Sequence, residues 1–292
     1  MTSAAASLDV VVSRRRRRAQ GFARLLRRPT AAISFGVVSL LVFGSVAAPL
    51  VAPYPKNKFD LNHLFAPPTF AHPFGTDELG RDLLTRVLYG GRTSLEIAAL
   101  ATAFAMAVGA VWGFAAAFRR GWLDELLMRI ADLTLGMPVI LLGLVLVAAF
   151  GSSTKSIVLI LGILFAPATA RLARSSLLAE LETDYYLAAV SVGTPPWQIV
   201  LKELLPNTTP VLLARASIVA ADAIFVEASL SFVGLGVQPP AASWGTLLQS
   251  GYSVLYSSYW YPIFPGLVIL TAVLSLNTLG DNLQRVLDPS RQ

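Results

Sequence analysis

Three charged residues interrupt an otherwise apolar stretch at positions 207–233: Arg215, Asp222 and Glu227. A charge inside a bilayer is costly, so these side chains are expected to face protein or water rather than lipid. Arg215 and Asp222 are seven residues apart, which places them on one face of a helix. The pattern predicts that all three line a pathway for a polar solute. The alternative is that they pair with each other or with a partner subunit purely for assembly.

Motifs that carry catalysis are missing from the sequence. It contains no GxxxxGK[ST] phosphate loop, HExxH motif or GxSxG motif. Thr154-Lys155-Ser156 comes nearest to a phosphate loop but lacks the glycine before the lysine. His63 and His72 are nine residues apart without clustered acids, and the chain has no cysteine, so we expect no metal site. The sequence therefore predicts a chain that is not an enzyme and binds no cofactor.

The amino-acid composition indicates which kind of structural element must position these charges. Of 292 residues, 55% are hydrophobic and 14% are charged, against about 25% charged in soluble domains. A helix needs about 20 apolar residues to cross the hydrocarbon core. Six stretches approach this length, of which the last two carry charges: 31–50, 97–118, 133–154, 261–280, 156–176 and 207–233. The sequence predicts an all-α membrane protein with six transmembrane helices.

Arginines predict the orientation of the chain. Residues 1–30 contain eight arginines, five of them consecutive, against one acid. The positive-inside rule places this basic N-terminal segment, and with six spans both termini, in the cytoplasm. The predicted order is a first helix over 31–53, an outer loop over 54–92, a five-helix core over 93–284 and a tail over 285–292. A nucleic-acid-binding arm is disfavoured because an apolar span follows at once, while contact with lipid or protein remains an alternative.

The outer segments offer two more candidate sites. Thr76 or Asp77 can cap an interfacial helix that runs to about Tyr89 and ends at Gly90 and Gly91. Asp82 and Arg86 within it have the spacing of an i,i+4 ion pair. A later charge-free outer segment is rich in aromatic residues, which are typical of the membrane interface. Both segments can instead form an outer gate or contact a partner; the residues proposed for this role are Asp77, Arg81, Asp82 and Trp244.

A polar loop over 180–207 separates two of the expected spans. Leu181, Tyr185, Ala188 and Val192 have the spacing of one helical face, and Gly193 can end that helix. Pro195 and Pro196 suit the start of a second helix that Pro206 would stop. Small residues at Ala188 and Ala189 favour insertion into a groove on a second protein. The alternative is a loop that packs against its own bundle.

This loop resembles the EAA loop of ABC-importer permeases, whose pattern is EAA, three residues, G, nine residues and I-x-L-P. Ala188, Ala189, Gly193, Leu205 and Pro206 match it, whereas Leu187 and Glu203 replace the Glu and the Ile of the pattern. Further segments resemble the C-type permease subunit of dipeptide and oligopeptide importers: HPFGTDELGRD from His72, YGGRTSL from Tyr89, EASLSFVGLGVQPPAASWG from Glu227 and LGDNLQRVLDP from Leu279.

The resemblance implies a type I ABC-importer permease in a bacterial cytoplasmic membrane. Its partners would be a homologous second permease, two ATPase subunits or one fused tandem ATPase, an extracytoplasmic peptide-binding protein and membrane lipids, with no nucleic acid. ATP and Mg would be bound by the ATPases. The residues expected to couple to an ATPase are Tyr185, Ala188, Ala189, Gly193, Pro196, Leu205 and Pro206. Alternative substrates are nickel complexes, glutathione and haem-type compounds; a secondary transporter working alone is the other function class.

Overall fold

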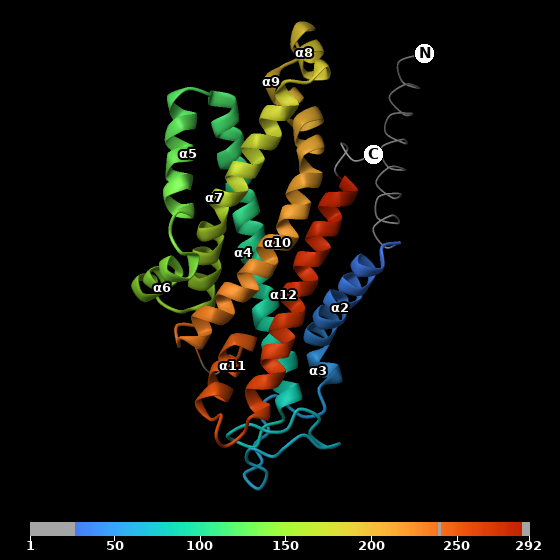
Figure 1. Ribbon diagram of the computed structural model, residues 1–292, viewed down its shortest axis with the longest axis vertical. Helices are drawn as coiled ribbons and strands as arrows, with labels where there is room; N and C mark the ends of the chain where they lie inside the picture. The colour runs from blue at the N-terminus through green and yellow to red at the C-terminus, as the bar shows by residue number, and fades with distance from the viewer. Residues whose placement is uncertain (1–26, 239–240, 288–292) are drawn as a thin grey trace.

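The computed structural model describes residues 27–238 and 241–287, which form a tall bundle of helices (Figure 1). In chain order the helices are α2 (Pro29–Val46), α3 (Ala48–Val51), α4 (Leu83–Arg119), α5 (Trp122–Leu135), α6 (Val139–Phe150), α7 (Thr154–Leu181), α8 (Asp184–Ser191), α9 (Pro196–Ile199), the π-helix η1 (Val200–Leu204), α10 (Leu205–Phe232), α11 (Trp244–Ser253) and α12 (Trp260–Leu287). Within these ranges there is no strand, only an isolated bridge from Thr76 to Asp82. The predicted all-α class is confirmed.

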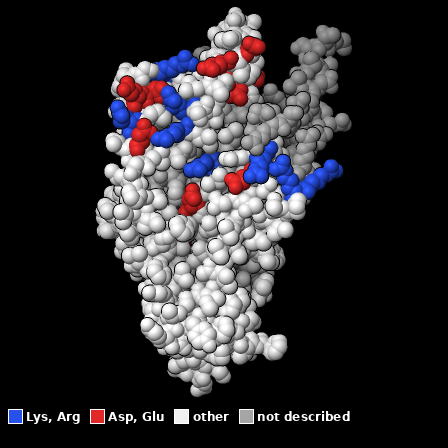
Figure 2. Space-filling view, viewed as in Figure 1, with Lys and Arg blue, Asp and Glu red and all other residues white. Residues whose placement is uncertain are grey.

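The bundle has two distinct ends. Helices α8 and α9 lie at one end, and α11 lies at the other with the segment between α3 and α4 (Figure 1). We call them the α8 end and the α11 end. On the face shown in Figure 2, charged side chains gather toward the α8 end, and the surface toward the α11 end carries none. The basic segment over 1–26 and the tail over 288–292 lie outside the described residues.

Helices α4 and α7 pack closely at the centre of the bundle because α4 carries glycines four residues apart. A Cβ atom at Gly109 would lie 2.6 Å from the Thr169 Cβ, and one at Gly113 would lie 2.2 Å from the Ala170 carbonyl oxygen. Small residues at this spacing let helix backbones approach in membranes, where the hydrophobic effect does not drive association. The α4–α7 pair therefore forms the spine against which α5, α6 and α10 pack.

The expected span over 133–154 is not one continuous helix. This region is a pair of helices, α5 and α6, that meet at an angle of 94°. Pro138 cannot donate the N–H that would continue α5, and a proline also drives the residue before it toward extended backbone. Helix α5 belongs with the charged residues that precede the apolar run. It is held to α7 by a bidentate ion pair between the Arg174 guanidinium and the Asp124 carboxylate, with both N–O distances 2.6 Å.

Four of the described helices are long and apolar enough to cross a membrane: α2, α4, α7 and α12, the last over Trp260–Val286. The bent α5–α6 pair makes a fifth if it is one broken span. Helix α10 has 28 residues, about 42 Å of helix, but with its three charges is not among these candidates. The count of six transmembrane helices therefore stays a prediction.

The interfacial helix expected from Thr76 or Asp77 to Tyr89 does not exist as a separate element. Asp82 caps the N-terminus of α4 by accepting a 2.7 Å hydrogen bond from the Thr85 N–H. The helix then runs through Gly90 and Gly91 without a break as far as Arg119. The expected ion pair from Asp82 to Arg86 is also wrong: the other Asp82 oxygen lies 3.0 Å from the Nδ1 atom of His72, and Arg86 approaches Asp77 instead.

Gly90 and Gly91 are contact points rather than helix terminators. A Cβ at Gly91 would lie 2.3 Å from the Ser45 Oγ and 2.8 Å from the Trp244 Cζ2. A Cβ at Gly90 would lie 3.3 Å from the backbone of Ser243, which caps α11. The two glycines therefore let α2 and α11 pack directly on the backbone of α4.

Candidate functional site

Helix α8 ends in a turn that depends on Gly193. The Gly193 N–H donates to the Val190 carbonyl at 3.0 Å, and the Thr194 N–H donates to the Ala189 carbonyl at 3.1 Å. These two bonds form a Schellman motif, which needs a left-handed residue after the C-cap. Gly193 has φ +71°, and a Cβ there would touch nothing within 4 Å. Helix α8 therefore ends at this turn because of the backbone conformation of Gly193 and not because of side-chain crowding.

Apolar side chains are exposed around this turn. Val192 is 82% exposed and Trp197 is 61% exposed, although both are large and apolar. We call the exposed set the α8 patch; it consists of Leu187, Val190, Val192, Trp197 and Leu201. A cluster of this kind at a tip marks a surface that another protein or a membrane covers.

The expected coupling residues divide between this surface and the loop's own packing. Ala188 is exposed beside the α8 patch, whereas Ala189 packs inward against a small core with Leu177 and Leu204. Leu181 is buried in the same core, so it does not share a free face with Ala188 and Val192. The loop is therefore both self-packed on one side and exposed on the other.

Tyr185 ties the loop to the bundle. Its hydroxyl donates to the Glu180 carboxylate at the end of α7 and accepts a 3.1 Å hydrogen bond from Asn207 of α10. Burial raises the pKa of Tyr185, and the bond to Glu180 raises it further. Tyr185 therefore stays a neutral donor that fixes α8 between α7 and α10.

The second loop helix does not stop at Pro206, which corrects the expectation from sequence. Helix α9 starts at Pro196 as predicted and passes through η1 directly into α10. A proline inside an α-helix clashes with the carbonyl four residues before it, and the wider π-turn over Val200–Leu204 accommodates this crowding. Leu205, partly exposed, and Pro206 form the first turn of α10. The exposed loop is thus joined to a long helix by unbroken helical backbone.

Arg215 and Asp222 meet at one cavity, as their spacing predicts. The cavity has a volume of about 200 Å³ and lies where α5, α6, α7 and α10 come together. Glu227, the third expected pathway residue, does not line it.

Glu227 instead lies at the junction of three helices and is 1% exposed. It accepts hydrogen bonds from the Ser94 hydroxyl of α4 at 3.2 Å and from the Ser231 hydroxyl at 2.8 Å. The Ser94 oxygen in turn accepts the Trp244 backbone N–H at 3.0 Å. This network joins α4, α10 and α11 away from the cavity that Arg215 and Asp222 line, and a pathway role for Glu227 stays a prediction.

The residues expected to contact an outer partner are mostly interior. Asp77 is fully buried and accepts hydrogen bonds from the Leu79 and Arg81 N–H groups and from the Arg81 side chain at 2.6 Å. Asp82 caps α4, and the Trp244 indole donates to the Val87 carbonyl at 3.0 Å. Their burial makes these side chains supports of the α11 end. Arg81 lines a polar cavity there, and its contact with a partner stays a prediction.

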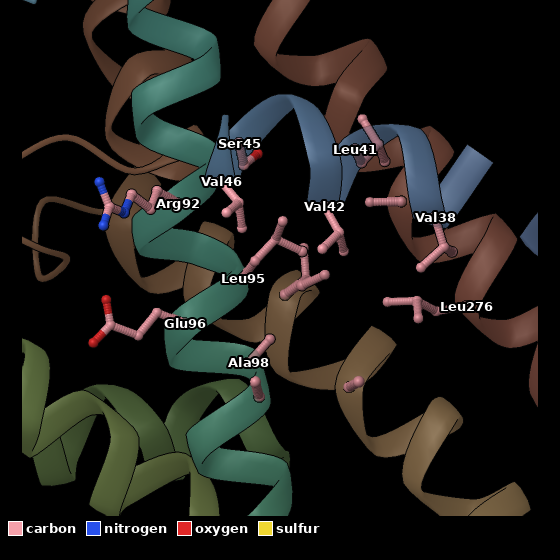
Figure 3. A pocket seen from close by; sticks show the side chains of 14 residues that line it. Val38, Leu41, Val42, Ser45, Val46, Arg92, Leu95, Glu96, Ala98 and Leu276 are labelled. Carbon is pink, nitrogen blue, oxygen red and sulfur yellow. The ribbon is translucent and has the colours of Figure 1, made fainter. Parts of the chain in front are cut away.

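Two charges on α4 were missed from sequence. Arg92 and Glu96 are exposed and line an apolar crevice of about 430 Å³ with Val38, Val42 and Val46 of α2. They therefore lie beside the apolar part of the first span rather than beyond its end. In Figure 3 their charged ends point away from α2. The sequence did not single out these positions because Gly90 and Gly91 were interpreted as a helix stop, which placed Arg92 in a loop.

Comparisons with known proteins identify the family. Residues 105–292 match the family described as binding-protein-dependent transport system inner membrane component, and residues 18–68 match the N-terminal TM domain of oligopeptide transport permease C. A putative peptide transport system permease protein of Brucella suis biovar 1 is 39% identical over 266 residues, covering 91% of this chain and 90% of the relative. The probable D,D-dipeptide transport system permease protein of Escherichia coli K12 is 34% identical over 261 residues, covering 89% and 88%.

A solved structure shares the fold. The MetNI methionine ABC transporter in an inward-facing conformation has a chain that matches with a TM-score of 0.58 at 22% identity, covering 70% of this chain and 96% of that one. The predicted ABC-importer permease fold and the resemblance to C-type permeases are confirmed. The chain belongs to the family of binding-protein-dependent transport system inner membrane components and is an integral, multi-pass permease of the inner membrane.

Proposed function

We propose that this chain is one transmembrane subunit of an ATP-driven importer of short peptides. The peptide and D,D-dipeptide permeases among its relatives support this substrate class. An extracytoplasmic binding protein delivers the peptide, and a homologous second permease completes the pathway. Two ATPase subunits, or one fused tandem ATPase, bind ATP and Mg on the cytoplasmic side, so this chain needs no cofactor of its own.

The α8 patch is the observation that carries this proposal. A membrane protein gains nothing from a water-exposed apolar tip unless a partner covers it. The basic N-terminal segment supports a cytoplasmic α8 end, on the side where the proposed ATPases bind. The patch then inserts into a groove of one ATPase in the manner of a helix laid into a hydrophobic cleft.

Continuous helix gives the ATPase a mechanical connection to the pathway. From Pro196 to Asp222 the backbone stays helical for about 40 Å, through α9, η1 and α10. Closure of the ATPase pair on ATP moves the α8 patch, and α10 carries that movement to the cavity with Arg215 and Asp222. Tyr185 keeps α8 attached to both α7 and α10 during the movement.

The second permease covers the α4 surface that carries Arg92 and Glu96. Neither side chain has an ion-pair partner within the described ranges, and a lipid contact at this position would leave both charges in hydrocarbon. Further along α4, small exposed residues lie four apart at Ala99, Ala103 and Ala107, which suits close helix packing.

The assay that tests the proposal is co-purification of the whole importer from cells, followed by uptake in reconstituted vesicles. Val192→Asp and Trp197→Asp should insert normally because both side chains are exposed, yet place an unpaired charge in the docking groove at a cost of about 3 kcal/mol or more. We expect loss of the ATPase subunits and of peptide uptake. Tyr256→Asp, at a fully exposed position of the α11 end, is the control.

Retention of the ATPases by both α8 patch variants would refute the coupling role. The same preparation reports on the second permease. Arg92→Glu and Glu96→Arg should each release it, whereas Lys155→Glu, an exposed cation at the start of α7, should not. A wild-type chain that transports solute in vesicles without any partner would instead establish a secondary transporter.

A further inference from the structure

The cavity at the α5–α6 break is lined by residues whose chemistry goes beyond what the passage of a solute requires. Its apolar wall comes mostly from α6 and α7, the end of α5 contributes a hydroxyl, and the break contributes a thioether. The residues that matter are Thr134, Met137, Val139, Leu164, Arg215 and Asp222. Ala168, also on the wall, is three residues from Arg171, whose ion pair with Asp132 joins α7 to α5. The cavity therefore begins about 5 Å along α7 from that ion pair.

Arg215 and Asp222 face this cavity but do not neutralise each other. No ion pair joins them or links either to another residue of the described ranges, and the buried Arg215 Nε has no hydrogen-bond partner. Two opposite charges left apart inside a membrane protein cost free energy, which a ligand with both charges would recover.

The spacing of Arg215 and Asp222 along α10 fits a short zwitterion. Seven residues of helix rise by about 10 Å, and an extended dipeptide spans about 7 Å, so the long arginine side chain can close the difference. Val139, the first residue of α6, lines the same cavity, and its helix has no side-chain cap. Free N–H groups there offer a carboxylate a second contact.

We propose that this cavity binds the peptide in transit by its two termini. Asp222 receives the α-ammonium group, and Arg215 with the α6 N-terminus receives the α-carboxylate. The break between α5 and α6 leaves the space in which the peptide backbone lies. This inference rests on the proposed import of short peptides, and it adds a terminus-reading site within the permease to whatever selection the binding protein makes.

The test compares one dipeptide in three forms: unmodified, C-amidated and N-acetylated. Uptake is measured with the complete importer in vesicles, each form being supplied at a concentration that saturates the binding protein. Arg215→Gln should reduce uptake of the unmodified dipeptide about tenfold or more, the loss expected for one charge-assisted hydrogen bond, and leave the C-amide unchanged. Asp222→Asn should likewise reduce uptake of the unmodified dipeptide about tenfold or more and leave uptake of the N-acetyl form unchanged. Arg215→Lys should retain much of the wild-type preference.

Equal losses of uptake for all three forms would overturn the proposal, because a structural or assembly role of these residues would lower the uptake of every form alike. Unchanged ratios in both variants would overturn it as well. Leu213→Ala, exposed on the same helix and outside the cavity, is the matched control for changes in α10. If the wild-type importer transports none of the three forms, the proposed substrate class fails; if it transports them and the ratios do not respond, only the terminus-reading site fails.

Discussion

Gly193 combines an open environment with a backbone conformation that other residues adopt at a cost. Because a Cβ at this position would touch nothing, any effect of substitution comes from φ +71° and not from a clash. Gly193→Val should disfavour the α8 turn by about 1–2 kcal/mol, since left-handed backbone is worst for branched side chains. We expect weaker stimulation of ATP hydrolysis by the loaded binding protein in vesicles.

Asparagine provides the control for that change. Gly193→Asn adds a polar side chain of similar size but tolerates left-handed backbone, so it should stay close to wild type. If the valine and asparagine variants behave alike, the turn conformation is not what positions the α8 patch.

Single residues of the site could be predicted only where backbone geometry decides them. Gly193 and Pro196 act by conformation, and both were assigned correctly as the end and the start of loop helices. Asp77 and Trp244 were expected at the surface and are buried, because the Asp77 carboxylate accepts loop N–H groups and the Trp244 indole donates to a carbonyl inside the fold. Sequence spacing does not distinguish these interior contacts from exposed ones.

At the scale of helices, the glycine contact between α4 and α7 gives a direct prediction. Gly113→Ala would place a methyl group 2.2 Å from the Ala170 carbonyl oxygen, and both backbones would have to separate. Overpacking of this kind costs about 1–3 kcal/mol. Thermal unfolding of the purified complex in detergent should shift to lower temperature.

Gly36→Ala on α2 is the corresponding control, because a Cβ there meets nothing within 4 Å. It should leave the unfolding temperature unchanged or raise it slightly, since alanine favours helix over glycine. Equal behaviour of the two variants would show that the α4–α7 approach is not as close as the glycines indicate.

The existence of most long helices could be predicted, but not where they end. Apolar runs correctly indicated α2, α4, α7 and α12. Two of the errors share one cause: Gly90, Gly91 and Pro206 were interpreted as local stop signals. Packing of α2 and α11 on the two glycines and the π-turn before Pro206 override the local signal. Pro138, with no such compensation, does break its helix.

For the whole molecule, the orientation in the membrane can be measured with single cysteines because the chain has none of its own. Ser191→Cys at the α8 end and Ser257→Cys at the α11 end are both exposed. The arginine-rich N-terminal segment predicts that a membrane-impermeant maleimide labels position 257 in intact cells and position 191 only after permeabilisation. The reverse pattern would place the α8 patch outside and remove it from any ATPase.

The exposed α8 patch also bears on how cells must produce this protein. If the proposed importer is right, a copy without its ATPase presents large apolar side chains to the cytosol, where they attract other exposed apolar surfaces. Surplus copies should therefore aggregate or be cleared by proteases, and yield should rise when the ATPases are synthesised at the same time. The α8 patch proposed to couple to the ATPase would thus also mark orphan subunits for disposal, and it would favour matched synthesis of the two components.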